Sequence, residues 1–198
     1  ICKDKVNFAG DVVAIVLATD KYAAADAASL VDVDYSALPA VVDMEQALAE
    51  GSTVVHQDLG TNATYTATLP CGDYEAAKAK ADVVVSRRFI QQRLIPNTME
   101  PRSVVAAPAV GMADEITVWS ATQIPHVLRV LLALATGIPE NHLRVVAPDV
   151  GGGFGAKLQM NREEVLATVL AKKLGRPIKW TESRSEHMVS THHGRDQI

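Results

Sequence analysis

The chain has 198 residues, of which 48% are hydrophobic and 21% are charged. This composition is typical of a globular protein and excludes a disordered or fibrous chain. The formal net charge is -4, with 19 Lys and Arg residues against 23 Asp and Glu residues. Nucleic acids and anionic membranes require clustered positive charge, so we expect neither as a partner.

The cysteines and the two ends of the chain bear on its location and extent. Cys2 and Cys71 make neither a disulfide framework nor a metal-ligand pattern, which favours a reducing cytoplasm. No apolar run approaches the roughly 18 residues that a membrane-spanning helix needs, so we expect no membrane span. The chain begins without Met or an apolar signal core and ends without a closing element. We therefore expect a fragment of a larger protein.

The overall pattern predicts an α+β fold in two parts, divided near residue 70. In residues 1–70, continuous or alternating β-branched runs favour strands, and an Ala-rich stretch after Asp20 favours a helix with an aspartate N-cap. The expected elements are a strand at 12–18, a helix at 21–30, a strand at 31–35 and a short helix at 44–50.

Residues 71–198 predict a second unit in which strands and helices are mixed. Pro125 suits the first position of a helix, and Gly137 suits its end. That helix is apolar nearly all round, which predicts that it is buried. The expected elements are helices at 74–80, 125–136 and 162–174, and strands at 83–89, 104–107, 116–120, 143–147 and 178–181.

The helix at 162–174 has the clearest boundaries. Asn161 and Glu164 have the spacing of a capping box, and Gly175 follows the last turn. One face is predicted to enter the core. Its members are large and apolar: Val165, Leu166, Val169, Leu170 and Leu174.

A glycine-rich run, Gly151-Gly152-Gly153-Phe154-Gly155, is the most informative stretch of the sequence. Such a run is tolerated where the backbone approaches another group closely or needs positive φ, and it can turn consecutive N–H groups toward an anion. Phe154, held between glycines, could form one wall of a pocket. The alternative is a tight turn with an ordinary core phenylalanine.

Two phosphate-binding motifs can be compared with this run. The Walker A pattern fails, because Ala156 precedes Lys157 and Leu158 follows it. The dinucleotide pattern G-x-G-x-x-[GA] fits formally at Gly151, Gly153 and Ala156. A module that binds NAD or FAD therefore stays open as an alternative function, beside a non-catalytic interaction domain.

Two further segments could belong to a site. Gln123 lies at the entry to the helix at 125–136, where it could donate to an anionic centre or tie the local backbone. Met99–Arg102 places Glu100 and Arg102 in an apolar neighbourhood, which favours an ion pair that organises a strand end. The six histidines show no ligand spacing, so we expect no metal held directly by side chains.

Three segments, in order and spacing, resemble one family. They are Met99–Arg102, Val118-Trp119-Ser120-Ala121-Thr122-Gln123-Ile124-Pro125-His126, and the stretch from Arg144 through the glycine run to Lys157. Together they resemble the large subunit of the molybdenum hydroxylases, the group of xanthine dehydrogenase, aldehyde oxidase and aerobic carbon monoxide dehydrogenase. The segments Asp4–Ala14 and 33–41 are similar to that family's α/β hammerhead domain.

The resemblance implies a hammerhead domain at 1–70 and the first part of a molybdopterin-binding domain at 71–198. The implied cofactor is a molybdenum-pterin, often as the cytosine dinucleotide. Gln123 would hydrogen-bond an oxo ligand, and the glycine run would pack around the metal centre. The cofactor-binding residues are then Gln123, Gly152, Gly153, Phe154 and Gly155, and the substrate pocket includes Phe154 and Leu158.

The resemblance also implies the activity and the partners. The enzyme would oxidise carbon monoxide, or hydroxylate an aldehyde or heterocycle with water-derived oxygen. Electrons would pass to iron–sulfur clusters and FAD on partner subunits, in an oligomer of heterotrimers. The family's catalytic base lies outside this sequence, so no catalytic residue is assigned and the isolated chain is expected to be inactive. Leu158 stands where xanthine-specific members have a purine-contacting glutamate, which argues against purine substrates.

Overall fold

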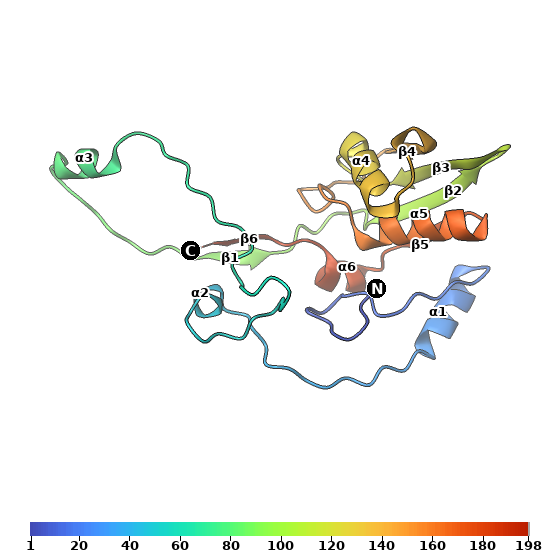
Figure 1. Ribbon diagram of the computed structural model, residues 1–198, viewed down its shortest axis with the longest axis horizontal. Helices are drawn as coiled ribbons and strands as arrows, with labels where there is room; N and C mark the ends of the chain where they lie inside the picture. The colour runs from blue at the N-terminus through green and yellow to red at the C-terminus, as the bar shows by residue number, and fades with distance from the viewer. Residues whose placement is uncertain (198) are drawn as a thin grey trace. The chain divides into compact units, whose positions relative to one another are not determined.

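The computed structural model describes residues 1–197, apart from the side chains at positions 112, 113 and 196 (Figure 1). The chain divides into two compact units, Ile1–Arg87 and Arg88–Ile198. Helices and sheets are mixed along it, which confirms the predicted α+β class. The predicted domain boundary near residue 70 stays a prediction.

The first unit contains three short helices, all of them predicted. They are α1 (Lys21–Ser29), α2 (Met44–Ala47) and α3 (Tyr74–Ala79). Each begins after an aspartate whose side chain accepts backbone N–H groups of the first turn: Asp20, Asp43 and Asp73. None of the three buries a residue, so local capping and propensity are what define them.

The strands predicted at 12–18, 31–35 and 83–89 are wrong. These segments are extended or irregular, and none joins a β-ladder among the described residues. Their apolar side chains are largely exposed, with Val85 at 70%. A strand requires a neighbour for its backbone groups as well as a suitable side-chain pattern, and here the neighbour is missing.

The second unit is built on a four-stranded sheet with the order β4-β3-β2-β5. The β2–β3 and β2–β5 pairs are antiparallel, and the β3–β4 pair is parallel. All four strands were predicted. Their bounds are β2 (Ser103–Ala109), β3 (Met112–Ser120), β4 (Leu143–Val146) and β5 (Ile178–Thr181). A separate antiparallel pair, not predicted, joins β1 (Gln91–Leu94) to β6 (Gly194–Gln197).

Two longer helices pack together on one face of the four-stranded sheet (Figure 1). They are α4 (Pro125–Thr136) and α5 (Arg162–Leu174), with the predicted bounds. The turn η1 (Glu140–His142) leads into β4, and α6 (Arg184–Ser190) follows β5. The core lies between sheet and helices and is formed by Val104, Ala106, Ile116, Val118, Leu128, Leu132, Ile138, Leu143, Ala167 and Ala171.

The predicted buried face of α5 is only partly correct: Val165 packs against the core, but none of the five predicted residues is fully buried. The helix buries a face of small and polar residues, Glu164, Ala167, Thr168 and Ala171, whereas Val169 and Leu174 are 40% and 47% exposed. Small side chains let the helix lie close to the sheet. Of the polar residues, Glu164 accepts from Ser120 of β3, and the Thr168 hydroxyl donates to the Glu164 carbonyl within the helix.

The predicted full burial of α4 is also wrong. Leu128 and Leu132 are its only fully buried residues, although nearly every position is apolar. Leu134 is 77% exposed, and Val127 is 51% exposed. In this chain α4 therefore presents a second apolar face to the surface.

Candidate functional site

The structure brings Gln123 and the glycine-rich run together. Gln123 lies between the end of β3 and the start of α4, and its backbone N–H donates to the Lys157 carbonyl at 3.0 Å. Its side-chain Oε1 accepts from the Gly155 and Lys157 backbone N–H groups, each at 3.2 Å. The carboxamide oxygen therefore ties the local backbone, which is one of the two roles that the sequence left open for Gln123. Its amide nitrogen donates to no other described residue.

Close approach explains two of the glycines. A Cβ added at Gly153 would lie 2.3 Å from Gln123 Oε1, and one at Gly151 would lie 2.5 Å from Glu100 Cβ. Neither distance is compatible with a side chain, so both positions require glycine in this arrangement. The close backbone approach expected of the glycine run is therefore present at these two positions.

The N–H groups of the run are mostly used inside the molecule. The Gly151 N–H donates to Glu100, that of Gly152 to Val150, and that of Gly155 to Gln123. Ala156 and Lys157 are also paired. Within the part of the chain that the structure describes, the N–H groups of Gly153 and Phe154 make no hydrogen bond. The expected row of free donors is therefore reduced to two adjacent ones.

Phe154 is exposed and lies in the left-handed backbone region. Its φ is 51° and its side chain is 76% exposed, so the alternative of an ordinary core phenylalanine is wrong for this chain. Such a φ costs a non-glycine residue about 1–2 kcal/mol. A Cβ on Gly152 would lie 3.1 Å from the Phe154 ring, so the ring leans over that glycine. Leu158, further along, is 53% exposed.

Behind the run lies an ion pair that the sequence did not indicate, with a buried lysine and a partly exposed glutamate. The Lys157 side chain is 1% exposed, and its Nζ donates to Glu100 Oε2 at 2.8 Å. The same oxygen accepts the Gly151 N–H at 2.8 Å. Burial alone would raise the pKa of the Glu100 carboxyl, but the bonds from Lys157 and Gly151 outweigh it and hold that pKa below its ordinary value.

Arg102 belongs to a second buried network. Its Nε donates to Glu182 Oε1 at 3.0 Å, and its guanidinium lies 3.3 Å from Glu163 Oε2. Burial lowers the pKa of Arg102, but the facing carboxylates Glu182 and Glu163 raise it overall. Glu100 and Arg102 therefore belong to different ion pairs: Glu100 pairs with Lys157, and Arg102 pairs with Glu163 and Glu182, all distant in the sequence.

Glu182 is the centre of this second network. Besides Arg102, it accepts from Ser190 Oγ at 3.1 Å and lies 2.9 Å from His187 Nδ1. Burial pushes its pKa up, but the hydrogen bonds from Arg102 and His187 lower it overall. His187 is fully buried, and its Nε2 faces the Pro96 carbonyl at 3.1 Å. Glu182 and His187 are 80 or more residues beyond Arg102, and no spacing rule could have joined them.

Glu164 connects α5 to the segment that carries Gln123. Its Oε2 accepts the Asn161 N–H at 2.7 Å, as the capping box predicts, and its Oε1 accepts from Ser120 Oγ at 2.5 Å. Burial raises the pKa of this carboxyl, because the hydrogen bonds only partly offset desolvation. Ser120 is the last residue of β3, three positions before Gln123.

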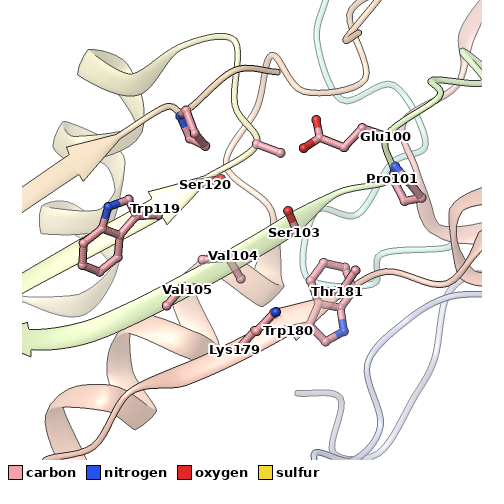
Figure 2. A pocket seen from close by; sticks show the side chains of 12 residues that line it. Glu100, Pro101, Ser103, Val104, Val105, Trp119, Ser120, Lys179, Trp180 and Thr181 are labelled. Carbon is pink, nitrogen blue, oxygen red and sulfur yellow. The ribbon is translucent and has the colours of Figure 1, made fainter. Parts of the chain in front are cut away.

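A cavity of about 370 Å³ is lined mostly by residues of β2, β3 and β5 (Figure 2). Val105, which pairs across the strands with Trp119 and with Lys179, is one of them. Glu100 and Pro148 also border the cavity. Gln123, Gly152–Gly155 and Leu158 do not line it, so the predicted site residues gather at a different place.

The geometry argues against the dinucleotide-binding alternative. In that motif the glycines join a strand directly to a helix, whose N-terminus faces the pyrophosphate. Here the run is followed by turns, and α5 begins only at Arg162. Gly151, the first glycine of the pattern, donates its N–H to Glu100.

Two features are absent from the described residues. No group of three or more His, Cys, Asp or Glu side chains there could hold a metal ion. Over the same residues, no helix combines the length and the apolar character needed to cross a bilayer.

Comparison with known proteins gives two family matches. Residues 55–198 match the molybdopterin cofactor-binding domain, and residues 1–39 match the α/β hammerhead domain of aldehyde oxidase and xanthine dehydrogenase. The first match alone covers well over half of the chain.

Individual relatives agree with these matches. The chain is 36% identical to the carbon monoxide dehydrogenase large chain of Afipia carboxidovorans, over 99% of this chain and 26% of that protein. It is 37% identical to subunit gamma of the 6-hydroxypseudooxynicotine dehydrogenase complex of Paenarthrobacter nicotinovorans, over 98% and 24%. The structure is similar to quinoline 2-oxidoreductase from Pseudomonas putida 86, with a TM-score of 0.80, 35% identity, and coverage of 90% and 22%.

The chain spans about a quarter of the length of the curated relatives it matches. The fold agrees with a solved member over nine-tenths of the chain, and the matches run in the order that the sequence motifs indicate. The chain belongs to the molybdenum hydroxylase large-subunit family, with matches to its hammerhead and molybdopterin cofactor-binding domains.

Proposed function

We propose that this chain is part of the large subunit of a molybdenum-dependent oxidoreductase that oxidises carbon monoxide or hydroxylates an aldehyde or heterocycle. One observation carries the proposal for the site. The Gln123 carboxamide is held by two loop N–H groups over Gly153, which leaves its amide nitrogen available to donate to a bound group. The curated and solved relatives, whose names include carbon monoxide dehydrogenase and quinoline 2-oxidoreductase, support the reaction class.

The residues present fit a molybdenum-pterin cofactor. The space that a Cβ on Gly153 would need is filled by the Gln123 side chain, so backbone and amide form one surface. The unpaired N–H groups of Gly153 and Phe154 suit an anionic or oxo group, and they bring no charge that would have to be desolvated. When bound, the cofactor supplies the redox chemistry. Gln123, Gly152, Gly153, Phe154 and Gly155 bind and orient it.

Phe154 and Leu158 form part of the substrate pocket in this proposal. Both side chains are exposed, at 76% and 53%, and both are apolar. They are therefore free to contact a bound molecule without disrupting the core. An apolar pair offers no hydrogen bond to a purine edge, which favours carbon monoxide, aldehydes or less polar heterocycles as substrates.

The finer assignments extend from the family. We propose the cytosine dinucleotide form of the cofactor, partner subunits that hold FAD and iron–sulfur clusters, and a cytoplasmic location. The relative named as one subunit of a dehydrogenase complex supports a multi-subunit assembly. Release and chromatography of the nucleotide, and absorbance of the copurifying subunits, test these assignments separately.

The decisive experiment uses the intact enzyme that contains this chain, produced with molybdate. We expect stoichiometric molybdenum and pterin, and oxidation of at least one substrate in a panel of carbon monoxide, aldehydes and N-heterocycles. Gln123→Ala should lower kcat at least tenfold, because the donor to the cofactor is lost, while molybdenum content stays within a factor of two. Enzyme without molybdenum, or Gln123→Ala with wild-type kcat, would contradict the proposal.

A further inference from the structure

We propose that the Lys157–Glu100 ion pair is a positioning device that holds Gln123 and the glycine-rich run in one arrangement. This inference rests on the proposed function of Gln123, and it assigns a role to two residues outside the cofactor-contacting set. Neither residue touches the proposed ligand. They act through the backbone of the run.

Lys157 is the point where three connections meet. Its backbone N–H donates to Gln123 Oε1 at 3.2 Å, and its carbonyl accepts from Gln123 N–H at 3.0 Å. The Thr122 hydroxyl lies 3.4 Å from the same carbonyl. Both ends of the Gln123 residue are therefore fixed by one peptide segment, so any shift of Lys157 moves the carboxamide with it.

The Lys157 side chain ties that segment to the far end of the run. Its Nζ and the Gly151 N–H share one oxygen, Glu100 Oε2, each at 2.8 Å. Glu100 also donates its backbone N–H to the Gly151 carbonyl at 3.2 Å. Since a Cβ on Gly151 would collide with Glu100 Cβ, the run is pressed against Glu100. A closed chain of contacts thus joins Gln123, Lys157, Glu100 and Gly151.

The choice of residue types supports a role beyond packing. Lys157 is the only lysine among the fully buried side chains of the described residues. Burying an ammonium group is costly, and an aliphatic side chain of similar volume would fill the space without that cost. An aliphatic side chain would not hold Glu100 in place as the acceptor for Gly151. The pair therefore constrains a segment that has several glycines and would otherwise have many conformations.

The test compares Lys157→Met and Glu100→Gln in the intact enzyme, with Arg129→Met as the matched control. Arg129 pairs with Glu140 at 2.6 Å on the surface, so its substitution removes an ion pair of the same charge type away from the run. The first readout is hydrogen exchange of the metal-free enzyme in peptides that cover residues 150–158. We expect at least tenfold faster exchange of the Gly155 and Lys157 amides in Lys157→Met, a smaller increase in Glu100→Gln, and none in Arg129→Met.

The second readout is a double-variant cycle with Gln123→Ala in the molybdenum-loaded enzyme. Alone, Lys157→Met should lower kcat at least fivefold with KM within a factor of two. In the Gln123→Ala background it should change kcat less than twofold, because its effect passes through the missing carboxamide. If the role of Lys157 were purely structural, the fold-losses of kcat in Lys157→Met and Gln123→Ala would multiply in the double variant.

The outcomes separate the two proposals. Unchanged exchange at residues 150–158 in both variants, or fully multiplicative kcat effects, would overturn the positioning role. Wild-type kcat in Gln123→Ala would overturn the proposed function, whereas the exchange of the metal-free enzyme would still decide whether the ion pair orders the run. If Lys157→Met does not fold, Glu100→Gln decides by the same two readouts, because Glu100 is one-third exposed and its substitution keeps its volume.

Discussion

Arg102 and Glu182 are 80 residues apart in the sequence and form a two-pronged contact inside the second unit. The Arg102 backbone N–H donates to Glu182 Oε2, and Arg102 Nε donates to Glu182 Oε1, both at 3.0 Å. The side chains are 6% and 0% exposed. Arg102 directly precedes β2 and Glu182 directly follows β5, so the contact holds two opposite charges together where these strands meet.

Arg102→Met should destabilise the protein strongly. Removal of one member of a buried pair leaves the other charge uncompensated, which typically costs about 3–5 kcal/mol of unfolding free energy. Glu182 would also lose two of its hydrogen bonds while staying buried. Urea denaturation followed by tryptophan fluorescence measures the change, since Trp180 lies against the Arg102 guanidinium.

The surface pair of Arg129 and Glu140 is the control for this prediction. These side chains are 46% and 43% exposed, so Arg129→Met should cost only about 0–1 kcal/mol. Equal costs for the buried and exposed pairs would show that burial of the Arg102 pair does not set its contribution.

Two carboxyl groups, Glu182 and Glu164, should contribute to the unfolding free energy with pH dependences of opposite sign. The pKa of Glu182 lies below its ordinary value of 4.5, so its contribution to stability is full above pH 4.5 and is lost as the pH falls toward the folded-state pKa. The pKa of Glu164 lies above 4.5, so its contribution is full below pH 4.5 and is lost as the pH rises toward the folded-state pKa.

Unfolding free energies of the wild type, Glu182→Gln and Glu164→Gln at several pH values measure this contrast. As the pH rises toward 4.5, Glu182→Gln should become progressively less stable relative to the wild type. As the pH rises above 4.5, Glu164→Gln should become progressively more stable relative to the wild type. Slopes of the same sign for both variants would contradict the assignment of opposite pKa shifts.

Elements defined by local signals could be predicted from the sequence. The bounds of α4 and α5 follow from Pro125, Gly137, Asn161 and Gly175, which act within one turn of each helix. Strands were predictable only where a partner exists. The run at 83–89 has strong β propensity, but no partner strand pairs with it among the described residues.

The candidate site was predictable in its composition and not in its connections. The Gln123 segment and the glycine run could be singled out from residue types. The contacts Lys157–Glu100 and Arg102–Glu182 could not, because they depend on how the strand ends meet across 57 and 80 residues. The residues that α5 buries could not be predicted fully, for the same reason. Glu164 is buried where Ser120 of β3 donates a hydrogen bond to its carboxylate, and the sequence of the helix alone does not indicate that contact.

Gly153→Ala should disturb the contact between the run and Gln123. The added Cβ would lie 2.3 Å from Gln123 Oε1, so the carboxamide must move and lose its two N–H bonds. We expect a loss of about 1–3 kcal/mol of unfolding free energy, typical of overpacking. Gly194→Ala is the matched control, because nothing lies within 4 Å of its added Cβ, and it should stay within about 0.5 kcal/mol of the wild type. Similar costs at both positions would argue against the close approach at Gly153.

Phe154→Gly and Phe154→Ala should separate the backbone strain at this position from the role of the ring. Both variants remove the ring, which is 76% exposed and contributes little to packing. Only glycine adopts the φ of 51° without steric cost, although glycine also makes the unfolded chain more flexible. The left-handed conformation costs alanine about 1–2 kcal/mol, so Phe154→Gly should be the more stable variant by about 0.5–1 kcal/mol in urea denaturation. If the ring is the functional element, the two variants should lose the same activity despite this difference in stability. A Phe154→Ala protein as stable as Phe154→Gly would mean that the backbone at 154 leaves the left-handed region in solution.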